Sequence, residues 1–330
     1  MNLPPEFIST ITNTFGADGE SWIANLPALI DEASERWGLT NIRPVPNLSY
    51  NFVAFATLPS PLTPLPVGEG NVVLKIGVPR DELTSEIAAL RLFNGEGACQ
   101  LIDADEQRGF FVLERLKPGV MLSTLEADEE ATHIAAEVMK KIWRPLEDVT
   151  LSGAKSLHGN GKDPSLPLRV TDNKFILLSD WFDGLKELRA MFDGRTGPLD
   201  EKLVERVEKS VVDFLIENHM PVLMHGDFHH FNILSSERGW LVIDPKGVIG
   251  PAGYEVGPFM INPWDSLSDG VSNQLILRRS DILHEHLGWE RERILEWSLA
   301  HAVLSAWWGI EDNTGWEYAL GFARLIADLN

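Results

Sequence analysis

The feature that most constrains the fold of this chain is a polar run, residues 235–239 (SSERG), with a short apolar run on either side. Apolar runs separated by turn residues in this way predict a β-hairpin. The run HGDFHHFN at residues 225–232 leads into the first strand, and Asp244 ends the second. Because a hairpin brings its outer ends together, we expect Asn232 and Asp244 to lie close to each other, with Asp227 on the preceding loop facing the same cavity.

Oxygen-bearing side chains grouped in this way suit phosphoryl transfer. Mg²⁺, which offsets the charge of a nucleoside triphosphate, prefers hard oxygen ligands and is usually held by one or two carboxylates together with phosphates. A carboxylate must also accept or orient the proton of the attacking hydroxyl group. Taken alone, the HGD run is more often a turn beside a core histidine, and Asp244 is more often a cap or turn residue. Their joint occurrence at hairpin spacing favours catalysis.

The histidines of this segment, His225, His229 and His230, allow a zinc site as an alternative, because imidazole binds zinc. Structural zinc sites have four ligands. No cysteine and no convincing fourth ligand accompany these histidines, and the pair His284 and His286 is no better placed. The sequence therefore favours a magnesium site over a zinc site.

The motif also carries a family resemblance. HxDxxxxN followed by an Asp on a strand resembles the catalytic core of protein kinases, and HGDxxxxN followed by IDP is similar to the aminoglycoside phosphotransferase family. IDPKG at residues 243–247, RWGL at 36–39 and LERLKPG at 113–119 resemble the streptomycin and hydroxyurea phosphotransferase branch of that family. The resemblance extends over most of the chain, from about Trp37 to the final helices.

This resemblance implies a two-lobed, protein-kinase-like α+β fold with ATP in the cleft. Residues 1–116 would form a strand-rich N-lobe with an antiparallel sheet and the nucleotide-binding lysine. Residues 117–330 would form a mainly helical C-lobe with the catalytic loop and the substrate site.

The resemblance also implies roles for the motif residues. Asp227 is the catalytic base, Asn232 and Asp244 hold Mg²⁺, and His225 is a structural residue of the catalytic loop. Many protein kinases have a lysine two positions after the base that contacts the transferred phosphate, and here His229 replaces it. Whether His229 takes over that role is open.

Two lysines are candidates for phosphate contacts. Lys75 interrupts the apolar strand 71–78, and a lysine in such a place is seldom fully buried without a partner. The resemblance supplies one, since a kinase strand lysine contacts the α- and β-phosphates and pairs with a helix carboxylate. Glu86 is the first candidate for that carboxylate and Glu82 the second; the alternative for Lys75 is an edge lysine that reaches solvent. Lys246 could supply positive charge near the transferred phosphate, although a solvent-exposed turn lysine is the simpler interpretation.

The nucleotide-covering loop carries no glycine-rich signature, since neither GxxxxGK[ST] nor GxGxxG occurs. We expect this loop one hairpin before the strand lysine, at residues 46–51, where Ser49 and Asn51 could donate hydrogen bonds to phosphate. The strand that ends at Leu116 should present backbone groups to adenine, with Glu114 to Leu116 nearest.

Candidates for acceptor binding lie in the last quarter of the chain, where aromatic and acidic side chains gather. Ring faces attract cations and carboxylates pair with them, so this mixture suits a polar cation. The alternative is that the tryptophans belong to the core and the acids to a solvated face. The candidates are Trp264, Asp265, Trp308 and Asp312, accompanied by Trp307 and Glu311.

Composition agrees with a small-molecule enzyme. The formal net charge is −21, with no basic run, which excludes broad nucleic-acid binding. The acidity suits a cationic substrate, although solubility alone is the simpler explanation for it. The single cysteine, Cys99, excludes an intrachain disulfide, and no apolar stretch is long enough to cross a membrane. No signal-like segment stands at the N-terminus, so we expect a cytoplasmic protein; the oligomeric state is not predicted.

Periodicity predicts the remaining elements. Beyond the hairpin, we expect strands near residues 50–58, 71–78 and 109–116. A loop is expected at 59–70 and another at 247–258. Helices are expected near residues 19–38, 81–93, 129–143, 174–191, 198–218 and within 276–329.

The function expected from all of this is ATP- and Mg²⁺-dependent transfer of the γ-phosphate to a hydroxyl of a small molecule, with an aminoglycoside-type antibiotic as one candidate acceptor. A metabolic kinase of a sugar or amino alcohol, unconnected with resistance, is nearly as well supported. A catalytically inactive nucleotide-binding protein is the less favoured alternative, because Lys75, Asp227, Asn232 and Asp244 occur together.

Overall fold

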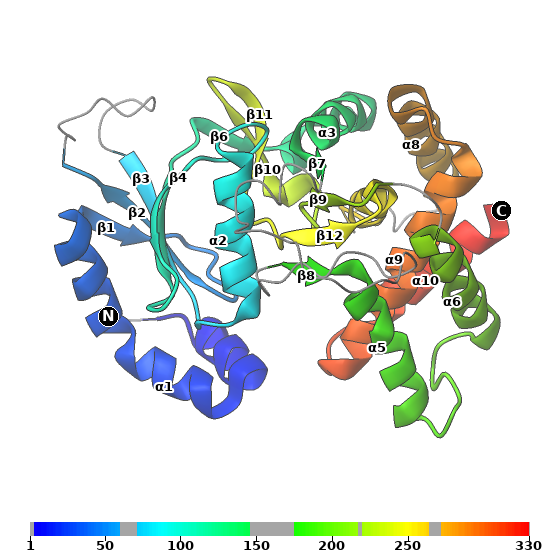
Figure 1. The fold of residues 1–330 in the computed structure, drawn as a ribbon, viewed down its shortest axis with the longest axis horizontal. Coiled ribbons are helices and arrows are strands. Elements are labelled where there is room, and N and C mark those ends of the chain that lie inside the picture. The colour runs from blue at the N-terminus through cyan, green and yellow to red at the C-terminus, as the bar shows by residue number, and fades with distance from the viewer. Residues whose placement is uncertain (1–2, 60–70, 146–174, 217–219, 264–271, 330) are drawn as a thin grey trace, which may run out of the picture.

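The computed structural model describes residues 3–59, 71–145, 175–216, 220–263 and 272–329, which form a strand-rich half and a helix-rich half (Figure 1). The first half contains a five-stranded antiparallel sheet in the order β1-β2-β3-β5-β4. Helix α1 covers one face and helix α2 stands against the other, on the side of the second half. Their bounds are α1 Pro5–Trp37, β1 Thr40–Pro44, β2 Phe52–Thr57, β3 Asn71–Ile76, α2 Asp81–Phe93, β4 Leu101–Asp105 and β5 Phe110–Glu114.

Strand β5, which lies between β3 and β4, is buried on both faces, and its alternating side chains explain the two helical layers. Phe110 and Val112 belong to the apolar cluster that includes α1. Phe111 and Leu113 belong to the cluster that includes α2. The sheet is therefore the middle layer of the first half.

Helix α1 differs from its prediction at one end only. It begins at Pro5 and is broken at Gly16, whose φ of 55° and ψ of −134° are not helical. It ends where expected, at Gly38, which takes the left-handed conformation. The indole Nε1 of Trp22 donates a hydrogen bond of 3.0 Å to the carbonyl of Gly77, directly after β3, so the first helix is tied to the end of that strand.

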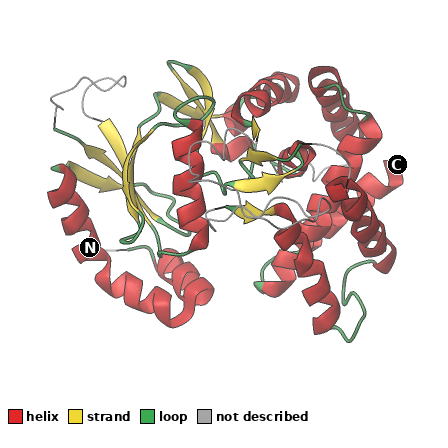
Figure 2. Ribbon diagram, viewed as in Figure 1, coloured by secondary structure: helices red, strands yellow, loops and turns green. Residues whose placement is uncertain are grey.

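Within the ranges given above, six long helices of the second half pack around a large apolar core. Figure 2 shows the helices in red. Two small sheets lie between these helices and the first half, in the orders β11-β10-β6 and β7-β9-β12-β8. The helices are α3 Asp128–Ile142, α5 Leu178–Met191, α6 Glu201–Ile216, α8 Ser272–Leu287, α9 Arg291–Glu311 and α10 Glu317–Leu329. The short elements are β6 Pro118–Met121, β7 Arg144–Pro145, β8 Ile176–Leu177, β9 Val222–Met224, β10 Ile233–Ser236, β11 Gly239–Val242, β12 Val248–Gly250 and α7 Val256–Met260.

Three sequence predictions need correction. Strand β1 was not predicted, because its sequence TNIRP is largely exposed and carries no apolar alternation. The helix expected at 174–191 begins only at Leu178, because the two preceding residues form β8 and pair in parallel with β12. Residues 247–258 form a buried strand and helical turns in place of a loop.

Most of the loop expected at 59–70 lies outside the described residues. Within the described ranges, no helix is both long and apolar enough to span a membrane.

Candidate active site

The predicted hairpin is present and sets the geometry of the site. Strands β10 and β11 pair with Ile233 opposite Val242. Beyond that pair, the N–H of Ile243 donates to the carbonyl of Asn232 at 2.9 Å. Asn232 therefore faces Ile243 across the open end of the hairpin, and Asp244 follows immediately.

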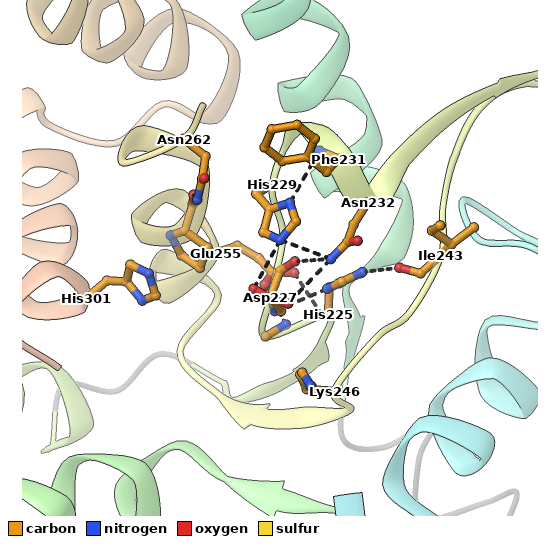
Figure 3. A network of polar contacts seen from close by, with 12 residues as sticks. His225, Asp227, His229, Phe231, Asn232, Ile243, Lys246, Glu255, Asn262 and His301 are labelled. Carbon is orange, nitrogen blue, oxygen red and sulfur yellow. Dashed lines mark hydrogen bonds and ion pairs between the residues drawn. The ribbon is translucent and has the colours of Figure 1, made fainter. Parts of the chain in front are cut away.

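Asp227 and Asn232 contact each other directly (Figure 3). The side-chain amide of Asn232 donates to the Asp227 carbonyl at 3.0 Å and lies 3.4 Å from its Oδ2. The amide oxygen of Asn232 therefore points away from Asp227, and no described residue donates a hydrogen bond to it. The Asp227 side chain is 39% exposed, so an incoming hydroxyl group can reach it.

His225 holds the catalytic loop in place. Its buried ring donates from Nε2 to the carbonyl of Ile243 at 2.8 Å and accepts from the Asp227 N–H at Nδ1, 3.1 Å away. Burial lowers the pKa of His225 to about 4, so the ring is neutral near pH 7. Its contacts are those of a structural residue.

Glu255 is a site residue that the sequence did not reveal. Its two carboxylate oxygens accept hydrogen bonds of 2.8 Å from the N–H groups of His225 and Gly226. Burial raises the pKa of Glu255 to about 8, although both backbone N–H groups act in the opposite direction. Glu255 lies far along the chain in a segment expected to be a loop, so no local pattern pointed to it.

His229 is directed at the base. Its Nδ1 accepts from the Phe231 N–H at 3.3 Å, and its Nε2 lies 3.5 Å from Asp227 Oδ1. Burial alone would raise the pKa of Asp227, but His229, then Lys246 and His225, hold it well below its ordinary value. Asp227 is therefore a carboxylate throughout the neutral range.

Lys75 makes the ion pair expected with Glu86. Its Nζ lies 2.7 and 2.8 Å from the two Glu86 oxygens and 3.3 Å from Asp244 Oδ1. Burial would lower the pKa of Lys75, but Asp244 and Glu86 outweigh it and raise the pKa above its ordinary value. At 3% exposure, Lys75 is not a solvent-reaching edge lysine. Glu82, the second candidate, is not its partner and instead pairs with Lys246.

The residues expected to contact the nucleotide lie at two ends of the sheet, because Asn51 precedes Phe52, which pairs with Ile76, whereas Glu114 pairs with Val72. Ser49 is exposed and Asn51 half-buried on the β1–β2 connection. The Asn51 side chain packs on Gly77 just beyond β3, since a Cβ there would come within 2.3 Å of its Oδ1. The Glu114 carboxylate is buried against the Gln100 N–H and the Arg238 guanidinium. Leu116 is also buried, in the α2 cluster.

The acceptor candidates have mixed outcomes. Trp264 and Asp265 lie outside the described residues. Trp307 is a core residue at 2% exposure, as the alternative interpretation held. Trp308 is half-buried and Asp312 exposed, both at the C-terminal end of α9.

An aromatic corner, formed by Trp181 and Trp308 over the buried Tyr254, adjoins the catalytic loop. The two indoles meet edge to face with centroids 5.3 Å apart, and Trp181 lies 5.7 Å from the Tyr254 ring. A Cβ on Gly226 would come within 3.1 Å of the Trp181 ring, which places this corner beside Asp227. Trp181 and Tyr254 escaped the sequence analysis because each looks like an ordinary helix or core aromatic.

The zinc alternative is not supported. In the part of the chain that the structure describes, no group of three or more His, Cys, Asp or Glu side chains is arranged to hold a metal ion. The His225 ring nitrogens are engaged in the loop, and the buried His230 ring stacks on Phe259 at 4.2 Å.

Sequence and structure comparisons agree with this geometry. The model of the aminoglycoside/hydroxyurea antibiotic resistance kinase family matches residues 48–152 and 171–313. The chain belongs to this family. The chain is 29% identical over 318 residues to a streptomycin 6-kinase of Streptomyces glaucescens, covering 95% of this chain and 92% of the relative. It is 28% identical over 315 residues to a hydroxyurea phosphotransferase of Kitasatospora aureofaciens, covering 94% and 81%.

Solved structures support the fold of this chain. An aminoglycoside phosphotransferase, APH(4)-Ia, in complex with ADP and hygromycin B matches with a TM-score of 0.57 at 14% identity, covering 90% of this chain and 97% of that one. A choline/ethanolamine kinase family protein from Mesorhizobium loti also matches with a TM-score of 0.57, at 15% identity, covering 91% and 94%. The predicted family branch and two-lobed kinase-like fold are thus confirmed. The protein is an ATP-using kinase that phosphorylates a hydroxyl group of a small molecule.

Proposed function

We propose that this kinase transfers the γ-phosphate of ATP, bound with Mg²⁺, to a hydroxyl of a cationic aminoglycoside-type antibiotic, with streptomycin as the first candidate. The observation that carries the proposal is the proximity of Asp227 and Asn232 at the open end of the hairpin, with Asp244 contacting Lys75 on the other side. Streptomycin is the first candidate acceptor because two similar relatives are streptomycin 6-kinases.

Asp227 is the proposed catalytic base. The acceptor oxygen forms a bond to the γ-phosphorus while the bond from that phosphorus to the β–γ bridging oxygen breaks, and ADP leaves with the electron pair. The hydroxyl proton passes to Asp227, which is ionised at neutral pH and partly exposed. The hydrogen bond from Asn232 keeps the carboxylate oriented.

The donor set near the hairpin fits Mg²⁺. The free amide oxygen of Asn232 and the half-buried carboxylate of Asp244 are hard oxygen ligands, and two protein ligands suffice when phosphates supply others. Bound there, Mg²⁺ would offset the charge of the triphosphate.

The nucleotide would lie between the halves of the molecule. We assign the α- and β-phosphates to Lys75, the covering loop to Ser49 and Asn51, and adenine to backbone groups from Glu114 to Leu116. We place the lobe boundary between residues 116 and 117, and strand pairing supports this proposal, because β5 belongs to the first sheet whereas β6 pairs with β10 of the hairpin.

The aromatic corner is the proposed wall of the acceptor site. Its two half-buried indoles stand beside the base, and Asp312 follows Trp308 by one helical turn. Guanidinium groups bind well to indole faces with a carboxylate nearby. That Trp264 and Asp265 contact the acceptor stays a prediction.

The test is a phosphotransfer assay with labelled ATP and four acceptors: streptomycin, hygromycin B, hydroxyurea and choline. We expect phosphorylation of streptomycin, dependent on Mg²⁺. Asp227→Asn should lower turnover by about 10²- to 10⁴-fold while leaving ATP affinity nearly unchanged.

Phosphorylation of choline or hydroxyurea alone would contradict the proposed acceptor and support a different small-molecule kinase. Full activity of Asp227→Asn would contradict the assigned base. Trp181→Ala should raise the KM for streptomycin more than it changes kcat, which tests the aromatic corner separately.

A further inference from the structure

Helix α2 holds both lysines near the site with carboxylates on successive turns. Glu86 pairs with Lys75, and Glu82, one turn earlier, pairs with Lys246. Between them, the Ser85 hydroxyl donates to the Gly247 carbonyl at 2.8 Å. The helix of the first half is thus joined to the segment that follows Asp244.

Lys246 is fixed at its backbone and loosely held at its side chain. Its N–H donates to the carbonyl of His225 at 2.7 Å, so the residue stays beside the catalytic loop (Figure 3). The ion pair with Glu82 is open to water, since the two side chains are 35% and 56% exposed. An exposed pair of this kind stabilises a protein by about 0–1 kcal/mol, so it breaks easily.

The catalytic loop itself supplies no mobile cation. His229 stands where a lysine would lie, but both of its ring nitrogens are engaged within the loop, since Nδ1 accepts from the Phe231 N–H and Nε2 lies 3.5 Å from Asp227 Oδ1. Lys75 is already engaged by Glu86 and Asp244. Among the residues that the structure describes, Lys246 is the lysine whose charge acts on Asp227. The phosphoryl group in transfer nevertheless needs positive charge beside it.

We propose that Lys246 is the cation that contacts the phosphoryl group during transfer, and that Glu82 holds its side chain aside when no nucleotide is bound. This inference rests on the proposed phosphotransferase function. The proton still passes to Asp227, and Lys246 remains protonated throughout. When the Lys246 side chain moves from Glu82 to the phosphate, its ammonium group exchanges one anionic partner for another.

The experiment compares Lys246→Met with Glu82→Gln, which removes the other half of the same ion pair. Titration calorimetry measures the affinity for MgADP with and without aluminium fluoride, which mimics the phosphoryl group in transfer, and an assay with streptomycin measures kcat. We expect Lys246→Met to lower kcat by about 10²- to 10³-fold, as for loss of one transition-state contact. In this variant, aluminium fluoride should no longer increase the affinity for MgADP. Its affinity for MgADP alone should stay within about threefold of the wild-type value. Glu82→Gln should change each quantity by about threefold or less, and Lys246→Arg should recover part of the fluoride affinity.

If the Lys246–Glu82 ion pair only joins the two lobes, we expect the opposite result. Both variants would then lose the same stability and the same activity, and neither would discriminate fluoride from ADP; that result, or an unchanged Lys246→Met, overturns the inference. Failure of the proposed function is distinguishable, because in that case wild-type protein modifies no acceptor, whereas the fluoride titration needs none. Thermal unfolding of each variant confirms that it is folded.

Discussion

At the scale of single residues, the site depends on buried charges that satisfy one another. Lys75 and Glu86 are almost completely removed from water, and Asp244 shares the lysine. Removing one partner of a buried pair leaves an uncompensated charge, whereas removing both does not. Replacing Lys75 alone should therefore reduce the free energy of unfolding more than replacing Lys75 and Glu86 together.

Lys75→Met should destabilise the protein by about 3 kcal/mol, because it leaves Glu86 buried without its cation. The double variant Lys75→Met/Glu86→Leu should regain much of that stability. Urea unfolding measures the difference, and nucleotide affinity should fall in both proteins. A double variant no more stable than the single one would show that the pair is not the source of the loss.

Several of these residues could be predicted from the sequence, because short-range pattern locates them. The hairpin spacing placed Asn232 beside the strand that ends at Asp244, and the family resemblance supplied a carboxylate on the next helix as partner for the lysine in the apolar strand. Glu255 and Trp181 could not be predicted. Their contacts with the catalytic loop arise only from tertiary packing, and nothing in their local sequence differs from that of a core residue.

At the scale of elements, the close approach of α2 to the segment after Asp244 is central. Gly247 has a φ of +68°, and a Cβ there would lie 2.7 Å from the carbonyl oxygen of Ser85. Only glycine fits both the backbone conformation and the space. Helix α2 itself was predicted with its correct bounds, whereas its partner segment was taken for a loop, because its glycines and prolines hid a buried strand.

Gly247→Ala should lower the free energy of unfolding by about 1–3 kcal/mol, through overpacking and an unfavourable φ. It should also weaken nucleotide binding, since α2 carries the partner of Lys75. Gly194→Ala serves as a control, because its φ is likewise positive but its Cβ would meet no atom within 4 Å. Equal destabilisation by the two variants would assign the effect to φ alone.

At the scale of the whole molecule, buried histidines make stability depend on pH. Burial lowers the pKa of His225 and of His301 to about 4, below the ordinary value of 6.5. At these two histidines the unfolded chain therefore binds more protons than the folded one between these values, so their contribution to stability is lost as pH falls from about 6.5 towards 4. Each full shift corresponds to about 3 kcal/mol.

His301→Gln tests this dependence, because glutamine does not titrate yet offers an oxygen to the Tyr254 hydroxyl, which now bonds His301 Nδ1 at 2.9 Å. The loss of stability between pH 7 and pH 4.5, measured by urea unfolding, should be smaller in the variant than in wild type. An identical loss would exclude His301 as a contributor.

The hydrogen bond from the Trp22 indole to the Gly77 carbonyl limits how far the protein can be truncated from its N-terminus. The family match begins at residue 48, so a fragment cut to that limit would discard α1 and β1. Such a fragment would expose the apolar face of the sheet that carries Lys75, and an exposed apolar face favours aggregation. It would also lose the Trp22 hydrogen bond to Gly77, directly after β3. The first helix belongs to the smallest unit that folds with an intact phosphate-binding lysine.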